Sequence, residues 1–540
     1  MSASTKDGQQ PSQIFIRNAT GLTRQLSAKD VLMFNLLNMG LAWPLLYIFF
    51  AGLAYQGINT PITVLIGLPG NLVIALLFYY LTTAFPRTGG DYVWVSRLVH
   101  PAIGFMESFA VVVFFLGFIG PVAGWFVTFG LAGIFNNLGV ATGNTSYFSL
   151  ATSLSSTNSV LVGSLVVLAA IVLGAVFGTK ISFRYQWATF ILMFVGIVTF
   201  LVVVGTTSQA TFQSNLQSLG NTSYNGIIQA ASKSGFITAF TFGGTLIGSF
   251  YSFLNYLGYY LSAYVGGEVK QSNRSQFIGI IGSILIFALI AFLMFFVPFQ
   301  TMGGSFINSA SLLASSGNST ISSQYTLPMA PVTSFLAIFA NPNPLVGILI
   351  PLAIIGSVFG SLETIVFSCV RIIFAWSFDG VVPTKFADVD RRGSPNYTLG
   401  LFAVVGLAYV LLSVYAANSL TFLAYTTSGI FIAIAFVGLA GIMLPYKHKD
   451  LFRLAPPNVQ RKIGGVPVIA LLGVATIIVA VFVAYTAASP VFTGAPVNPV
   501  YLAGLALVFI VGLVIYAIAY YYNKSKGFNL ALRFAEVPPE

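Results

Sequence analysis

Charged residues are scarce in this chain. Asp, Glu, Lys and Arg make up 6% of its 540 residues, whereas soluble domains average about 25%. Hydrophobic residues make up 57%, and the mean hydropathy is +0.90. The apolar runs are continuous rather than alternating, which favours membrane-spanning helices over the strands of a β-barrel. The composition excludes a soluble domain and predicts an all-α polytopic membrane protein.

Cysteine and histidine are nearly absent. The single cysteine, Cys369, lies in an apolar run, which excludes an intramolecular disulfide. Two histidines, His100 and His448, are too few for a metal or haem centre. The sequence also lacks a Walker-type glycine-rich lysine loop and a convergent catalytic set. We therefore expect no metal, no cofactor, no catalytic residues and no enzymatic activity, and the polar N-terminus predicts no signal peptide.

The apolar runs predict twelve transmembrane helices. A straight helix needs about 20 apolar residues to cross a bilayer. Twelve runs approach or exceed that length: 31–54, 61–83, 101–134, 158–178, 184–205, 236–264, 276–299, 345–370, 397–416, 419–444, 465–488 and 499–522.

The net charge of +11 is concentrated on one side of these predicted spans. With the N-terminus in the cytoplasm, 21 of the 23 Lys and Arg residues fall in cytoplasmic loops and tails. Lys233 falls outside, and Arg371 lies near the inner end of a span. This asymmetry satisfies the positive-inside rule. It predicts a multi-pass protein of the cell membrane with cytoplasmic tails at 1–30 and 523–540, and it assigns the charge no role in binding nucleic acid.

The sixth run is an unusual helix candidate because it is rich in Gly and Tyr. Each Gly weakens a helix by about 1 kcal/mol relative to Ala, and unpaired backbone groups are costly in lipid. A broken helix beside a polar cavity, as in the binding sites of secondary transporters, fits this pattern. Glycines that let helices approach closely fit it as well, and the stretch alone leaves both interpretations open. Its small and polar residues include Gly243, Gly244, Gly248, Tyr251, Asn255, Tyr256, Gly258, Tyr259 and Tyr260.

Four polar motifs separate the apolar runs. They are LTRQLSAKDV (22–31), FPRTGGDYVWVSR (85–97), GEVK (267–270) followed by Arg274, and RIIFAWSFDGVVPTKFADVDRRGSPNYT (371–398). In order and spacing these motifs resemble those of the amino acid–polyamine–organocation (APC) superfamily of permeases.

The resemblance implies a leucine-transporter-like fold. A transport core over 31–444 would contain two inverted five-helix repeats, about 31–205 and 236–444, followed by two additional helices within 465–522. Helices one and six would be interrupted at the substrate site. The implied activity is secondary active transport of amino acids or related amines by alternating access. The implied partners are a small-molecule substrate, a coupling proton or sodium ion, and membrane lipid.

The first span contains a candidate interruption. Pro44 removes a backbone donor and breaks a helical hydrogen bond, and Gly40-Leu41-Ala42 stands where the superfamily usually has Gly-x-Gly. Carbonyl and N–H groups at such a break suit an amine and a carboxylate. A proline kink without a ligand is the alternative. The candidate substrate-binding residues are Asn38, Met39, Gly40, Leu41 and Ala42.

In the sixth span, Tyr256 to Tyr260 matches the superfamily pattern of aromatic-x-Gly-aromatic-Glu. Gly258 is retained, whereas Tyr260 replaces the acid and puts the role of that acid in doubt. Tyr256 or Tyr251 could close over the substrate as a gate, and packing within the bundle is the alternative for each tyrosine. The candidates are Tyr251, Asn255, Tyr256, Gly258, Tyr259 and Tyr260.

Two acidic residues lie within predicted spans. Glu363 is in the middle of span eight, where a carboxylate costs about 2.5–3.5 kcal/mol, so it is a candidate for binding a substrate amine or a proton. A neutral, hydrogen-bonded Glu363 is the alternative. Arg371 lies about 12 Å along the same helix, too far to pair with it. Glu107, near the inner end of span three, is expected to meet water or a loop arginine.

The coupling ion is left open. Many superfamily members have a lysine in helix five, but the matching position here is Met193. Oxygens of Ser357, Ser361 and Thr364, together with Glu363, are candidates for binding the ion, although Ser and Thr also join membrane helices. Proton coupling, sodium coupling and exchange remain possible on this pattern.

Charges at the inner face could form a gate of ion pairs or a solvated surface. They are Arg87, Asp91, Asp379, Arg391 and Arg392. The alternatives to an amino acid transporter are a membrane sensor or scaffold without transport, a polyamine or organocation permease, and a channel. Glu363 favours a cationic substrate, whereas the many aromatic residues favour a bulky neutral one.

Overall fold

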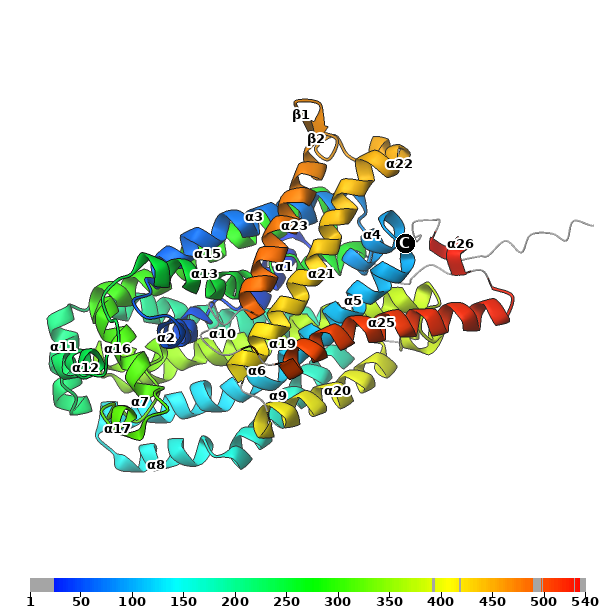
Figure 1. Ribbon diagram of the computed structural model, residues 1–540. Coiled ribbons are helices and arrows are strands. Elements are labelled where there is room, and N and C mark those ends of the chain that lie inside the picture. Colours follow the sequence, from blue (N-terminus) through cyan, green and yellow to red (C-terminus); the bar gives the residue numbers. More distant parts are fainter. Residues whose placement is uncertain are drawn as a thin grey trace, which may run out of the picture.

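The computed structural model contains a bundle of long helices (Figure 1). It describes residues 24–390, 394–416, 419–488, 497, 499–528 and 530–534. Eleven helical stretches among these residues are long and apolar enough to cross a membrane. Helices suit this environment because they satisfy their backbone groups internally. The predicted all-α polytopic membrane fold is confirmed.

Among the described residues up to 233, the regular elements are helices. They are α1 (Ala28–Met39), α2 (Pro44–Ala54), α3 (Thr60–Ala84), α4 (Asp91–Leu98), α5 (Pro101–Gly117), α6 (Ile119–Trp125), the π-helix η1 (Phe126–Leu131), α7 (Ala132–Thr142), α8 (Thr145–Leu154), α9 (Thr157–Val176), α10 (Thr179–Gly205), α11 (Gln209–Gly220) and α12 (Tyr224–Lys233).

The second part, from residue 242, adds further helices and a small β-hairpin formed by β1 and β2. Its elements are α13 (Phe242–Tyr256), η2 (Leu261–Ala263), η3 (Gly266–Glu268), α14 (Ser272–Gln276), η4 (Phe277–Gly282), α15 (Ser283–Pro298), η5 (Phe299–Gly303), α16 (Gly304–Ala314), α17 (Ser319–Ser322), α18 (Thr333–Leu336), η6 (Ala337–Phe339), α19 (Pro344–Phe378), η7 (Thr384–Ala387), α20 (Asn396–Tyr415), α21 (Ser419–Lys447), α22 (Lys449–Leu454), β1 (Lys462–Ile463), β2 (Val466–Pro467), α23 (Val468–Ala488), α25 (Pro499–Ser525) and α26 (Leu530–Phe534).

The first span is interrupted where the sequence predicts it. Helix α1 ends at Met39, and Gly40 turns the chain with a positive φ of 63°. The N–H of Gly40 closes the helix by donating to the carbonyls of Leu36 and Leu37, at 3.1 and 3.0 Å. Helix α2 then starts at Pro44, whose missing N–H is no loss in a first helical turn.

The sixth span is interrupted as well. Helix α13 has 15 residues and ends at Tyr256, and the chain then passes through Gly258, whose φ is 114°. Only Gly adopts such a conformation readily. Short 3-10 turns, η2 and η3, follow instead of a continuing α-helix. The interruption explains why eleven long helices, and not twelve, are found among the described residues.

Side chains pair the exposed backbone at this second interruption. Asn35 on α1 accepts from the N–H of Ser262 at 2.9 Å and donates to its hydroxyl at 3.0 Å. Gln276 donates to the carbonyl of Ser262 at 3.0 Å and accepts from its hydroxyl at 2.7 Å. All three residues are fully buried. Helix α1 is thereby joined to the unwound part of span six.

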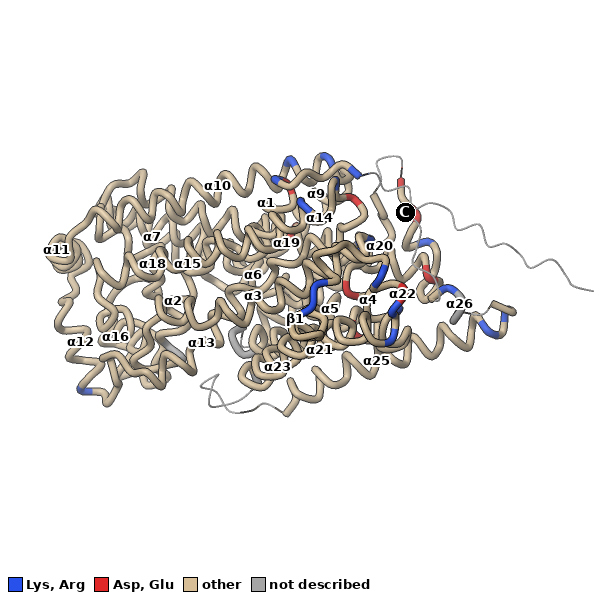
Figure 2. The backbone as a smooth tube through the Cα atoms, turned by 90° about the horizontal axis from the view of Figure 1, so that it is seen from above, with Lys and Arg blue, Asp and Glu red and all other residues tan. Residues whose placement is uncertain are grey.

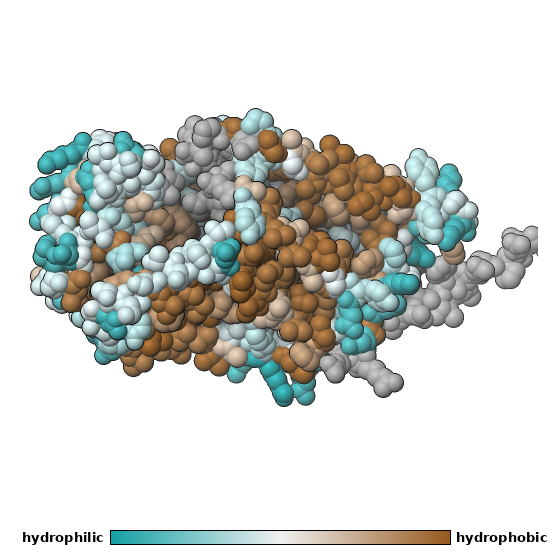
Figure 3. All heavy atoms as spheres, turned by 90° about the horizontal axis from the view of Figure 1, so that it is seen from below, coloured by the Kyte–Doolittle hydropathy of each residue, from teal (hydrophilic) through white to brown (hydrophobic). Residues whose placement is uncertain are grey.

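The surface separates into an apolar band and two polar ends (Figure 3). Lys and Arg gather at the end that carries α4, α22 and α26, which we call the basic end (Figure 2). A basic segment at the opposite end lies beside α12, whose last turn contains Lys233. The division of 31–444 into two inverted repeats, with 465–522 as additional helices, stays a prediction.

Candidate functional site

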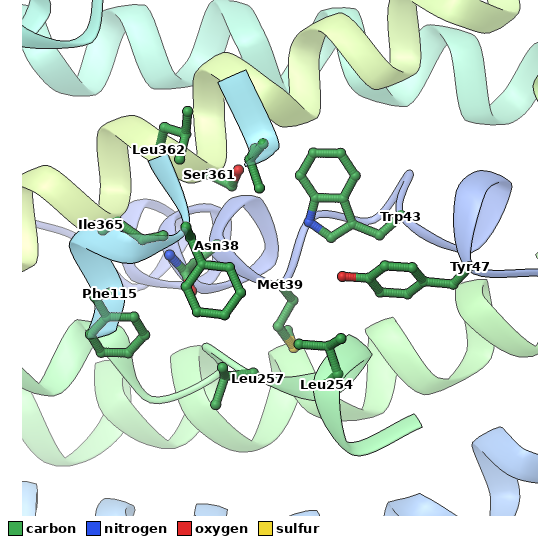
Figure 4. Close-up of a pocket in the computed structure, with 12 residues that line it drawn as sticks. Asn38, Met39, Trp43, Tyr47, Phe115, Leu254, Leu257, Ser361, Leu362 and Ile365 are labelled. Carbon is green, nitrogen blue, oxygen red and sulfur yellow. The ribbon is translucent and has the colours of Figure 1, made fainter. Parts of the chain in front are cut away.

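A small cavity lies where the two interrupted spans meet (Figure 4). Its volume is about 40 Å³, enough for a few water molecules. Four parts of the chain contribute: the α1–α2 junction, the α5–α6 region, the end of α13 and the middle of α19. The lining residues are Asn38, Met39, Trp43, Tyr47, Phe115, Phe118, Val122, Leu254, Leu257, Ser361, Leu362 and Ile365.

The lining is mainly apolar with a few polar atoms. Asn38 contributes a side-chain amide, whose nitrogen donates to Thr364 Oγ1 at 2.9 Å. Ser361, the hydroxyl of Tyr47 and the indole N–H of Trp43 are further polar groups at the cavity (Figure 4). Among the described residues that line it, none is charged. An apolar pocket with a few placed polar groups is typical of a small-molecule site.

The structure brings only part of the predicted site residues to the cavity. Asn38, Met39 and Ser361 line it. The remaining predicted residues do not: Gly40, Leu41, Ala42, Tyr251, Asn255, Tyr256, Gly258, Tyr259, Tyr260, Ser357, Glu363 and Thr364. Thr364 still reaches the site indirectly through its hydrogen bond with Asn38.

The predicted tyrosines of span six pack inside the bundle. Tyr256 donates its hydroxyl to the carbonyl of Val64 at 3.2 Å. Tyr260 packs against Phe78 with ring centroids 4.3 Å apart. The ring of Tyr251 lies 6.2 Å from that of Tyr47. These contacts agree with the alternative interpretation that the tyrosines pack within the helix bundle.

Two of the aromatic residues that line the cavity come from the first span and were missed, and Phe115 and Phe118 of the α5–α6 region were missed as well. Trp43 and Tyr47 line it, and both pack on Trp125 of α6, with centroid distances of 5.3 and 6.4 Å. The available signal was their position: they flank Pro44, at the predicted break. Aromatic rings there can close over a bound molecule.

Glu363 lies on another side of α19. Its carboxylate Oε1 accepts from the hydroxyl of Ser182 on α10, and Oε2 has no hydrogen-bond partner among the described residues. A Cβ atom added to Gly174 on α9 would lie 3.1 Å from Oε2. The carboxyl group is therefore buried among α9, α10 and α19, and it does not line the cavity.

Towards the basic end, a buried ion pair closes the bundle. Arg371 Nε on α19 lies 2.6 Å from Glu268 Oε1, which follows the interrupted span six. Thr179, at the start of α10, hydrogen-bonds to both partners at 3.1 Å. Glu268 is 0% and Arg371 3% exposed. The pair and Thr179 thus join α19, the start of α10 and the segment that follows the interrupted span six.

A second cluster lies beside the first. Asp379 pairs with Arg97 at 2.7 Å and accepts from the hydroxyl of Tyr92 at 2.8 Å. This contact supports the predicted role of Asp379 in an ion pair. Arg87 forms no ion pair among the described residues, and Arg391 and Arg392 lie outside those residues.

Asp91 occupies a buried acidic site rather than an ion pair. It accepts from the hydroxyl of Tyr264, beyond the interruption in span six, at 2.6 Å. Glu107 lies beside it and is 0% exposed. The expectation that Glu107 meets water or a loop arginine is wrong, because α4 folds back on α5 and covers it.

We expect the Glu268–Arg371 pair to be required for stability. Glu268→Gln leaves Arg371 buried and unpaired, which costs about 3–5 kcal/mol. The double variant Glu268→Met/Arg371→Met should lose much less stability, because it leaves no unpaired buried charge. Thermal unfolding of the purified proteins in detergent measures both.

The exposed Asp450–Arg453 pair gives a matched control. Its side chains are 96% and 78% exposed and lie 3.8 Å apart, so Asp450→Asn should leave the melting temperature unchanged. Equal melting temperatures for wild type and Glu268→Gln would contradict the assigned role of the buried pair.

We expect the stability of the protein to depend on pH because the carboxyl group of Asp91 is buried. Burial raises the pKa of its carboxyl group to about 6, although the hydrogen bond from Tyr264 opposes this shift. The folded state therefore binds the proton more tightly than the unfolded state, and its stability falls as the pH rises from about 4 to 6. The melting temperature should fall over this interval.

Asp91→Asn should flatten that part of the curve, because the side chain no longer titrates. Asp388→Asn, at an exposed position, should retain the wild-type pH dependence. Parallel curves of melting temperature against pH for wild type and Asp91→Asn would contradict the assignment of this pH dependence to Asp91.

Comparisons with known proteins give a short match to one relative and a match to a family over most of the chain. Over 79 residues the chain is 30% identical to Uncharacterized protein 399 of Sulfolobus islandicus rod-shaped virus 1. The aligned part is 15% of this chain, and the chain spans about a fifth of the length of that relative. The profile of the family described as Amino acid permease matches residues 31–511, nearly the whole chain. With its interrupted first and sixth spans, the chain belongs to the amino acid permease family.

Proposed function

We propose that the protein is a secondary active transporter that moves a neutral amino acid across the cell membrane by alternating access. The observation that supports this best is the cavity between the two interrupted spans. Membership of a permease family gives the coarser statement, a transporter of amino acids or related compounds. The basic end faces the cytoplasm in this proposal, in agreement with the positive-inside rule.

The ends of the interrupted helices suit a zwitterion. The C-terminal end of α1, at Met39, carries the negative end of a helix dipole, which favours an amino group. The N-terminal end of α2, at Pro44, carries the positive end of its dipole, which favours a carboxylate. Asn38 and the hydroxyl of Tyr47 add hydrogen-bonding groups between them.

The lining favours an apolar substrate side chain over a cationic one. Leu254, Leu257 and Ile365 form apolar walls, and the lining described above contains no carboxylate. A polyamine or cationic amino acid would leave its distal charge unpaired there, which is costly. Glu363 cannot provide the missing charge from its place between α9 and α10 without a rearrangement of α19.

Transport requires the cavity to enlarge. At about 40 Å³ it holds a few water molecules, so the walls must move apart to admit an amino acid. Towards the basic end the Glu268–Arg371 pair and the Asp379–Arg97 pair must break for access. We propose these two pairs as the cytoplasmic gate.

Glu363 is our candidate for the coupling-proton site. A buried carboxylate without a cation partner is costly in the membrane, and such acids often carry protons in transporters. A movement of α19 against α10 would change the Ser182 contact and admit water to Oε2. Sodium binding by Ser357, Ser361 or Thr364 is the alternative. Ser357 Oγ is buried and has no hydrogen-bond partner within the described part of the chain.

Uptake into proteoliposomes tests the proposal. We expect saturable uptake of labelled neutral, apolar amino acids that an imposed pH gradient drives. Glu363→Gln should abolish the gradient-driven accumulation yet retain counterflow exchange. Leu257→Trp, which fills the cavity, should abolish both.

Other outcomes favour the alternatives. Preferred uptake of polyamines or cationic amino acids would contradict the assigned substrate class. A sodium gradient that drives uptake equally in wild type and Glu363→Gln would exclude Glu363 as the coupling site. Flux without saturation or counterflow would indicate a channel, and ligand binding without flux would indicate a sensor.

A further inference from the structure

A second, larger cavity lies at the basic end, remote from the substrate site. Its volume is about 640 Å³, and it lies between the segment that follows α19 and the C-terminal helices α25 and α26. Nothing in the transport mechanism above uses it. Its walls divide into an apolar part and a cationic part.

The apolar part belongs to a helix at the margin of the bundle. Ile515, Ile518 and Ala519 of α25 line the cavity, opposite Val381 and Val382. Of the most apolar 18-residue stretch of α25, only 11% is buried by the protein. Ile518 is 64% exposed. In a membrane, this face of α25 contacts lipid chains, and the cavity is continuous with that face.

The cationic part combines three segments of the chain. Lys385 comes from η7, Lys526 follows α25, and Arg533 comes from α26. Neither lysine forms an ion pair with a carboxylate among the described residues. No Asp or Glu is among the described residues that line this cavity. Lys385 and Lys526 therefore place positive charge next to an apolar wall.

The surrounding contacts fix the shape of this cavity. Asn523 on α25 donates to the carbonyl of Gly380 at 3.1 Å, which holds the two walls together. Lys526 Nζ lies 4.5 Å above the ring of Tyr522, which restricts the position of its charge. Both Asn523 and Tyr522 line the cavity.

We propose that this cavity binds an anionic phospholipid of the leaflet at the basic end. The phosphate would lie among Lys385, Lys526 and Arg533, and an acyl chain would follow Ile515 and Ile518. Charge complementarity selects an anionic headgroup over a zwitterionic one. The continuous apolar wall selects a lipid over a soluble phosphate, because a free ion would leave that wall exposed to water.

A bound lipid would also stabilise the contacts around the Asp379–Arg97 pair at the basic end. Gly380 follows Asp379, which pairs with Arg97. The ring of Phe534 lies 4.9 Å from the Arg97 guanidinium, so α26 covers this pair. A headgroup that holds Lys526 and Arg533 together keeps α26 in place over the closed pair.

The test uses the full-length protein, purified and delipidated in a neutral detergent. Phosphatidylglycerol, phosphatidylcholine or inorganic phosphate is added at equal concentration, and the melting temperature and the lipid retained in native mass spectra are measured. We expect phosphatidylglycerol to raise the melting temperature by several degrees more than phosphatidylcholine, with one retained lipid per chain. Inorganic phosphate should have no comparable effect.

Two variants address the two parts of the site separately. Lys385→Glu/Lys526→Glu should remove the preference for phosphatidylglycerol, and Ala519→Phe should reduce retention of lipid by filling the cavity without a change of charge. Lys447→Glu/Lys449→Glu, with the same change of charge at residues that do not line the cavity, should behave like wild type.

The proposal has three contrary outcomes. Equal stabilisation by both lipids would show that headgroup charge is not recognised. Equal loss in the Lys447→Glu/Lys449→Glu control would show a general effect of surface charge. Stabilisation by inorganic phosphate alone would indicate a soluble anion. If Ala519→Phe is itself less stable, its melting temperature is not used. The ratio of phosphatidylglycerol to phosphatidylcholine retained in native mass spectra then decides whether headgroup charge is recognised.

Discussion

The structure depends on how the backbone of the interrupted sixth span is satisfied within the membrane. Unpaired N–H and carbonyl groups cost several kcal/mol each there. Ser262 follows the interruption, and side chains of Asn35 and Gln276 pair both its N–H and its carbonyl. Because Asn35 belongs to α1, the same contacts fix the first span against the sixth. The interruption in span six is therefore stabilised by contacts with the continuous part of α1.

The position of the cavity follows from this constraint. Gly258 approaches Asn38 so closely that an added Cβ would overlap its side chain, so the end of α1 lies against the unwound segment. Asn38 in turn contacts Thr364 of α19. Three spans thus converge at one point, with helix ends supplying polar groups among apolar walls. Towards the basic end, the buried Glu268–Arg371 pair joins α19 to the segment that follows span six.

Sequence reasoning located both interruptions but not every side chain around the cavity. Gly40, Pro44 and Gly258 signal a break by their backbone chemistry, which is a local property. The direction of a side chain such as Tyr256 or Glu363 depends on the rotation of its helix, which tertiary packing sets. The Glu268–Arg371 pair joins residues 103 positions apart, so no local pattern predicts it. The aromatic residues Trp43 and Tyr47 were adjacent to a recognised signal and were still missed.

Accessibility of the cavity from the two sides of the membrane tests the account most directly. Cys369 is the single cysteine and is buried, so Cys369→Ala provides a background for Leu257→Cys at the cavity. In vesicles of known orientation, an impermeant maleimide is applied to one side at a time. Alternating access predicts labelling from either side, with protection by a transported amino acid. Labelling from one side only, or labelling that no transported amino acid affects, would contradict a substrate site between the two interrupted spans.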